Sequence, residues 1–138
     1  MRTFLAIVAC VAVGLVAAAP ALADVQVKLT TSSRAPKMGE AWRWTITVRD
    51  GAVPARARVR LQILLGGTVV GCFKASAMAA CTGAAAGDVL EVTGKRTGVI
   101  RWPAESVGVR LTFQAVVMTK IGTLRLRAPV RVAPAGSA

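Results

Sequence analysis

Apolar and polar residues alternate with a period of two along most of the chain beyond residue 24. The pattern is longest over residues 42–49, 56–65, 109–118 and 123–132. Because successive side chains of a strand point to opposite faces, each segment is predicted to be a β-strand with one buried and one solvated face. The side chains predicted to face inward include Trp42, Trp44, Leu61, Ile63, Phe113, Leu124 and Leu126.

Glycine residues mark the turns between these strands. Gly66-Gly67 predicts a tight hairpin onto a strand over residues 68–72, and Lys120-Ile121-Gly122 predicts the turn between the last two long strands. Shorter strands are expected at residues 25–31, 88–93 and 98–102. Seven or so strands at spacings of about 8–12 residues predict an all-β chain, folded as a single antiparallel β-sandwich.

The alternation stops between Cys72 and Gly87, where alanine and glycine leave few side chains to pack. We predict a long loop here, and a short alanine-rich helix is the alternative. Residues 135–138, at the end of the chain, are expected to form a flexible tail.

Two stretches carry a resemblance to a known family. Residues 36–42 read PKMGEAW, and residues 48–59 read VRDGAVPARARV. They resemble the P-x-x-G-x-x-W and V-x-D-x-G-x-P-V-x-A-x-V patterns of bacterial Ig-like domains of the fibronectin III/Big type. Residues 100–104 (IRWPA) and 111–117 (LTFQAVV) are similar to small exported Ig-like proteins of actinobacteria. The resemblance implies an Ig-like β-sandwich of about seven strands over residues 24–134.

The first 23 residues are predicted to be a secretory signal peptide. Arg2 is followed by an uncharged apolar run, and Ala21 and Ala23 place small residues before a cleavage site at Asp24. A transmembrane anchor and a lipoprotein site at Cys10 are the alternatives, but the run is short for a span and continues past Cys10. We expect a secreted or cell-envelope protein without a transmembrane anchor. Removing the signal peptide lowers the net charge from +12 to +11, because Arg2 is lost and no acid is.

The two cysteines beyond the signal peptide are Cys72 and Cys81. An even pair in an oxidising compartment predicts a disulfide between them, and two free thiols are the alternative. The pair lies within one predicted loop, unlike the antibody-type pair that bridges two sheets.

The residue types that the sequence lacks exclude several kinds of catalytic and metal site. The chain has no histidine and no tyrosine, so a Ser-His-Asp triad and histidine metal sites are impossible. The six acids are scattered, with only Asp88 and Glu91 close in sequence, and no phosphate loop or dinucleotide motif is present. We therefore expect no catalytic residues, no metal and no cofactor.

Arginines recur at outward positions of the predicted strands, and in an Ig-like sandwich these strands are neighbours in one sheet. The set is a candidate anion-binding face: Arg56, Arg58, Arg60, Arg110, Arg125, Arg127 and Arg131. Guanidinium groups suit phosphates and carboxylates. The alternative interpretation is an ordinary solvated surface, in which arginine also discourages edge pairing. Aromatic residues are expected in the core, which disfavours base stacking and hence nucleic acid as the ligand.

Three functions follow as hypotheses. The first is a secreted, non-catalytic structural or interaction module of the cell envelope, and the second is a polyanion-binding protein that uses the arginine-bearing sheet. The third is an accessory subunit that pairs with a partner through an edge strand. The expected partner is an anionic envelope polymer or another envelope protein. The sequence leaves the oligomeric state open.

Overall fold

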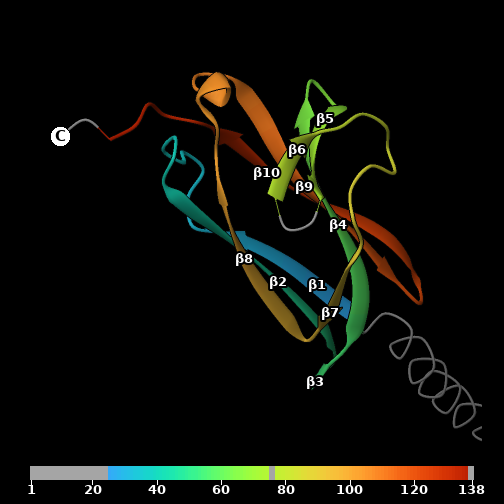
Figure 1. The fold of residues 1–138 in the computed structure, drawn as a ribbon. Helices are drawn as coiled ribbons and strands as arrows, with labels where there is room; N and C mark the ends of the chain where they lie inside the picture. Colours follow the sequence, from blue (N-terminus) through green and yellow to red (C-terminus); the bar gives the residue numbers. More distant parts are fainter. Residues whose placement is uncertain (1–24, 75–76, 137–138) are drawn as a thin grey trace, which may run out of the picture.

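The computed structural model describes residues 25–74 and 77–136, and it is a β-sandwich of two antiparallel sheets (Figure 1). The predicted signal peptide, residues 1–23, lies outside the described residues. The all-β class and the sandwich predicted from the period-two pattern are confirmed. The described residues form ten β-strands, and a 3-10 helix, η1 (Ala104–Ser106), follows β8.

The smaller sheet is built around β2 (Ala41–Asp50). One edge of β2 pairs with β1 (Val25–Thr31), and the other pairs with β8 (Lys95–Arg101) and the two-residue β3 (Val53–Pro54). Trp42, Trp44 and Ile46 point inward from β2, whereas Arg43 and Thr45 point to solvent, as the alternation predicts.

The larger sheet runs in the order β10-β9-β4-β5-β6, with β7 also paired to β4. Its strands are β4 (Arg56–Leu65), β5 (Thr68–Lys74), β6 (Ala77–Ala80), β7 (Leu90–Thr93), β9 (Arg110–Thr119) and β10 (Gly122–Arg131). Gly66 and Gly67 form the predicted two-residue hairpin turn between β4 and β5. Both have positive φ, at 59° and 84°, the conformation that favours glycine in this turn.

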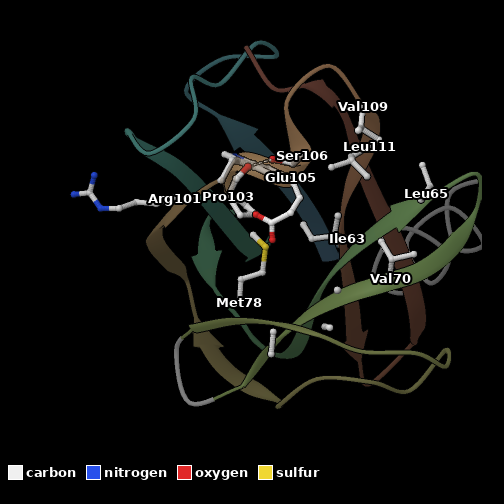
Figure 2. A pocket seen from close by; sticks show the side chains of 14 residues that line it. Ile63, Leu65, Val70, Met78, Arg101, Pro103, Glu105, Ser106, Val109 and Leu111 are labelled. Atoms are coloured by element: carbon white, nitrogen blue, oxygen red, sulfur yellow. Dashed lines mark hydrogen bonds between the residues drawn. The ribbon is translucent and has the colours of Figure 1, made fainter. Parts of the chain in front are cut away.

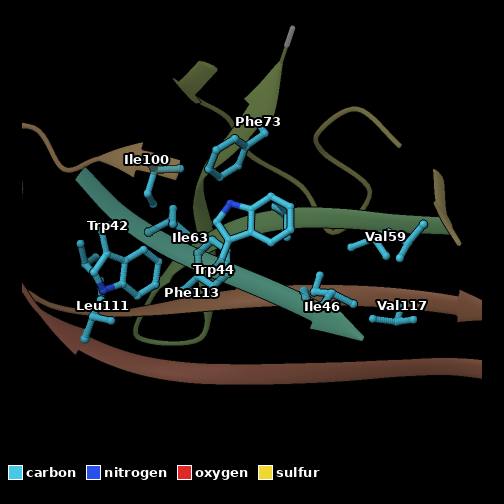
Figure 3. Close-up of a cluster of buried hydrophobic side chains, with 14 of the residues drawn as sticks. Trp42, Trp44, Ile46, Val59, Ile63, Phe73, Ile100, Leu111, Phe113 and Val117 are labelled. Carbon is cyan, nitrogen blue, oxygen red and sulfur yellow. The ribbon is translucent and has the colours of Figure 1, made fainter. Parts of the chain in front are cut away.

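Aromatic side chains fill the space between the sheets. Trp42 packs edge-on against Trp102 and Phe113, with ring centroids 5.3 and 5.1 Å apart. Figure 3 shows Trp42 and Trp44 projecting from β2 toward Phe113 and Ile63 of the larger sheet. The indole Nε1 of Trp42 donates to the Ser33 carbonyl at 2.8 Å, so its one polar group is satisfied.

The predicted loop over residues 72–87 is wrong in its first half. β5 continues to Lys74, and Ala77–Ala80 forms β6, which pairs with β5 from Gly71↔Ala80 to Lys74↔Ala77. Alanine has a low strand propensity, so the segment carries no strand signal in the sequence, and it is held by pairing to β5. β6 and the short β3 were not among the predicted strands, and the described residues form ten strands where about seven were expected.

Leu124 and Leu126 face the same side of the sheet as the core, but they are less buried than predicted. Both lie on β10 at the edge of the larger sheet, where Leu124 is 44% exposed and Leu126 is half-buried. The smaller sheet has fewer strands than the larger one, so it covers the larger sheet incompletely at this edge.

The predicted disulfide between Cys72 and Cys81 is present, with the two Cα atoms 5.7 Å apart. Cys72 lies opposite Gln62 in β4, on the outer face of the larger sheet. The disulfide therefore fastens the segment after β6 to that outer face, and it does not bridge the two sheets.

Candidate functional site

The outer face of the larger sheet brings the predicted arginines onto one surface. β4, β9 and β10 are hydrogen-bonded neighbours, and their outward positions carry the residues that we call the arginine face. These are Arg56, Arg58 and Arg60 of β4, Arg110 of β9, and Arg125, Arg127 and Arg131 of β10.

The register places Arg60 and Arg125 in one row across the sheet. Each is paired with Val116 of the intervening β9. Two strand spacings separate their backbones by about 10 Å. Val116 is buried although it faces outward, and Arg60 is half-buried beside it. The arrangement fits an Arg60 stem that covers an apolar side chain, and the Nε of its guanidinium is itself buried with no hydrogen-bond partner among the described residues.

Arg127 lies in the next row and is oriented by a chain of side-chain hydrogen bonds. Its Nε donates to the Oε1 of Gln114 at 2.7 Å. The Nε2 of Gln114 donates to the Oε1 of Gln62 at 2.9 Å, and the Nε2 of Gln62 donates to the carbonyls of Ala84 and Ala86 at 2.9 and 3.0 Å. Because the Nε of Arg127 is already used, its two terminal nitrogens are the donors left for a ligand.

This hydrogen-bond chain spans the sheet from β10 to the loop after the disulfide. The loop residues Ala84 and Ala86 lie over Gln62, which is fully buried on the face predicted to be solvated. Sequence reasoning missed Gln62 and Gln114 as members of this surface. In the sequence they are visible only as uncharged polar residues among the arginine, threonine and apolar residues at the outward positions of β4 and β9.

Arg110 and Arg131 share the arginine face but stand apart from its centre. They pair with each other at one end of β9 and β10. The row formed by Thr112 and Pro129 separates them from Gln114 and Arg127. The Nε of Arg131 donates to the Gly108 carbonyl at 3.3 Å. The arginine face therefore consists of a central group on β4 and β10 and a separate pair at one end.

Glu91 of β7 lies at the edge of the arginine face. Its Oε2 is 3.6 Å from the Nε of Arg58, and both side chains are mostly exposed. Such an exposed pair contributes at most about 1 kcal/mol to stability. It leaves Arg58 partly neutralised, whereas no ion pair is formed by Arg60, Arg125 or Arg127 with any residue that the structure describes.

A second feature is an open groove of about 570 Å³ between the larger sheet and the segment from β8 to η1 (Figure 2). Its lining is mainly aliphatic and includes Ile63, Met78 and Leu111, with one carboxylate, Glu105. Another pocket, of about 670 Å³, lies at the other end of the sandwich and has Asp50 in its lining. Within residues 25–74 and 77–136, no cluster of three cysteine or acidic side chains could hold a metal ion.

No protein-family model matches the chain, and no curated protein does either. Among solved structures, the sporulation control protein Spo0M from Bacillus subtilis is similar over 80% of this chain and 49% of its own, with 13% identity and a TM-score of 0.45. A β-glucosidase from Listeria innocua is similar over 82% of this chain and 17% of its own, with 12% identity and a TM-score of 0.37. The same enzyme in complex with glucose gives 11% identity over 80% of this chain and 16% of its own, with a TM-score of 0.34.

The chain thus spans about half the length of Spo0M and a small part of the β-glucosidase. Similarities at this level carry no argument about function. In the part of the chain that the structure describes, no helix has the length and apolar character to cross a membrane.

Proposed function

We propose that the chain is an exported, non-catalytic interaction domain of the Ig-like type, and that its arginine face binds an anionic polymer of the cell envelope. The observation that supports this most is the adjacency of β4, β9 and β10, which gathers outward arginines from three separate stretches of sequence. Export rests on the signal-peptide pattern of residues 1–23 and agrees with the disulfide between Cys72 and Cys81.

The spacing of the central arginines suits a polymer better than a single small anion. Arg125 and Arg127 are two positions apart on one strand, which separates them by about 7 Å. Arg60 lies about 10 Å from Arg125 across the sheet. A chain of phosphates or carboxylates can contact several such charges in turn, and each contact releases a counterion. Binding should therefore weaken steeply as salt rises.

Like charges on neighbouring strands also repel, at a cost of some tenths of a kcal/mol for each facing pair. On the arginine face, Glu91 offsets this repulsion only at the edge, beside Arg58. A bound polyanion would relieve the repulsion across the whole face, which favours binding further.

The experiment that tests the proposal measures binding of long-chain polyphosphate to the mature domain as a function of salt. The charge-reversal variant Arg58→Glu/Arg125→Glu should weaken binding at low salt by at least about tenfold. The matched control is Arg43→Glu/Arg49→Glu, which changes the net charge equally on the outer face of the smaller sheet. The control should keep most of the affinity.

Equal losses in the two variants would mean that only net charge matters, and the proposed site would be wrong. Absence of binding at low salt would favour the alternative, a structural domain with a solvated arginine surface. Circular dichroism and thermal unfolding of each variant establish that the fold is intact.

A further inference from the structure

The groove lies on the side of the sandwich where the two sheets do not match. The larger sheet continues past β4 through β5 to β6, and the groove lies between its inner face there and the segment from β8 to η1. Figure 2 shows Met78 and Ile63 of the larger sheet and Glu105 of η1 around this space, whereas the guanidinium of Arg101 points away. A volume of about 570 Å³ lies in the range of ligand pockets.

Where β5 and β6 pair, the residues on the floor of the groove have very small side chains. Gly71 has no side chain, and its partner Ala80 has one methyl group. A Cβ at position 71 would sit 3.4 Å from the Cβ of Ile63, so the missing side chain opens space directly beside a core residue. The groove can therefore accept a side chain that the protein does not supply itself.

Three consecutive residues of β6, Met78, Ala79 and Ala80, line the groove. Neighbouring residues of a strand point to opposite faces, so a cavity beside one face of the sheet would touch only alternate side chains. Consecutive lining residues show that main-chain atoms of β6 are within reach of the groove. Among the described strands, β6 pairs with β5 alone and so ends the larger sheet on the side where the groove lies.

β6 has none of the charged or proline residues that occur on the other edge strands. Ala77–Ala80 contains alanine and methionine only, whereas β1 carries Lys28, β8 carries Lys95 and β10 carries Pro129. Proteins use lysine and other charged residues, and also proline, which has no backbone N–H, to prevent an exposed edge from pairing with further strands. An edge without them is open to an added strand.

Glu105 gives the groove a charge preference. It is an exposed carboxylate among aliphatic lining residues, and it forms no ion pair with any residue that the structure describes. The chain as a whole is strongly basic, with a net charge of +12. A second copy of such a chain would be repelled, and an apolar ligand with one cationic group would complement the groove.

We propose that β6 and the groove bind an extended peptide segment of a partner protein by strand addition. The peptide main chain pairs with the free edge of β6. On one face of the peptide, an apolar side chain enters the space above Gly71 and packs against Ile63, Leu111 and Met78, and a basic side chain reaches Glu105. The site is separate from the arginine face, which lies on the opposite face of the same sheet.

The test begins with a phage-displayed library of random peptides of roughly ten residues, the upper length of ordinary strands, selected on the mature domain. Enriched peptides should carry apolar residues at alternate positions and a basic residue in phase with them. The tightest peptide is then synthesised, and its affinity is measured by fluorescence anisotropy. Methylation of alternate backbone amides in that peptide should weaken binding by at least about tenfold, because it removes the strand donors.

Two substitutions on β6 separate the groove from the strand as a whole. Ala80→Leu fills the groove beside Gly71 and should weaken peptide binding by about tenfold or more. Ala77→Leu adds the same atoms to the same strand outside the groove lining and should leave binding unchanged. Glu105→Gln should weaken the basic peptide several-fold, and it should not affect a version with alanine in place of the basic residue.

Several results would overturn the proposal. These are selection of no common pattern, binding that survives backbone methylation, and equal effects of Ala80→Leu and Ala77→Leu. Concentration-dependent dimerisation that is abolished by Ala80→Leu would assign the edge to a second copy of the chain. Peptide binding through β6 should change little with salt, whereas polyphosphate binding at the arginine face should weaken steeply. The two proposals can therefore fail independently.

Discussion

Gln62 of β4 and Gln114 of β9 face each other on the outer side of the larger sheet, yet both are buried, and the Nε2 of Gln114 donates to the Oε1 of Gln62 at 2.9 Å. The pair joins two features far apart in the sequence, the loop after the disulfide and Arg127 of the arginine face. Buried polar groups of this kind stabilise a fold only when every member is bonded.

Replacing Gln62 with leucine should therefore destabilise the domain. The substitution removes the donor to the carbonyls of Ala84 and Ala86 and the acceptor for Gln114. We expect a loss of about 1–3 kcal/mol in the free energy of unfolding, measured with urea. Gln26→Leu, at an exposed position of β1, is the matched control and should change stability by less than about 0.5 kcal/mol. Gln62→Leu should also speed amide exchange at residues 84–86, and Gln26→Leu should not. If Gln62→Leu changes neither the free energy of unfolding nor this exchange, the hydrogen-bond chain is wrong.

The disulfide should contribute through the short loop that it closes. Cys72 and Cys81 are separated by 9 residues, for which the chain-entropy model gives about 2.5–3 kcal/mol. The Cys72→Ala/Cys81→Ala variant should lose roughly this much stability in urea unfolding. Addition of dithiothreitol should lower the stability of the unsubstituted domain and leave the variant unaffected. If neither the double substitution nor dithiothreitol changes the urea midpoint of unfolding, the bond does not form in the protein.

Gly98 of β8 should tolerate no side chain. It is paired with Trp44 in the smaller sheet, and a Cβ at position 98 would overlap the Cζ2, Cε2 and Nε1 atoms of that indole. Because Trp44 is buried in the core, we expect Gly98→Ala to cost about 1–3 kcal/mol and to alter tryptophan fluorescence. Val99→Ala, the exposed neighbour on the same strand, is the control. If Gly98→Ala is as stable as the control, the packing of Trp44 described here is wrong.

Glu91 should oppose polyanion binding. Its carboxylate pairs with Arg58 at the edge of the arginine face, and both groups are exposed. Glu91→Gln should therefore change stability by less than about 1 kcal/mol and increase the affinity for polyphosphate at low salt by a few-fold. Glu40→Gln makes the same charge change before the start of β2 and should have a smaller effect. An equal gain in both variants would point to net charge alone.

The sequence predicted the strands that carry strong alternation and the turn that needs glycine. The segment 56–65 became β4 and Gly66-Gly67 became its hairpin turn, because burial of one face and a positive φ are local requirements. The disulfide was predictable from the pair of cysteines together with the oxidising compartment that the signal-peptide pattern predicts. The outward placement of Arg58 and Arg125 also followed from the period of two.

What the sequence did not predict depends on contacts between distant segments. β6 is a strand because β5 offers it an edge, and the composition of Ala77–Ala80 carries no signal for that pairing. Gln62 and Val116 occupy outward positions and are buried, Gln62 by the loop at Ala84 and Ala86 and Val116 in a row between two arginines. Leu124 occupies an inward position and is exposed, because β10 is an edge strand. Periodicity gives the face of a residue but not what covers that face.

The most direct test of the account is to observe the arginine side chains of the mature domain during titration with polyphosphate, using the NMR signals of their Nε–Hε groups. Arg60, Arg125 and Arg127 should shift first and by the largest amounts, and the shifts should disappear at high salt. Arg43 and Arg49, on the outer face of the smaller sheet, should hardly move. Shifts spread evenly over both sheets, or confined to Arg43 and Arg49, would contradict a binding site on the arginine face.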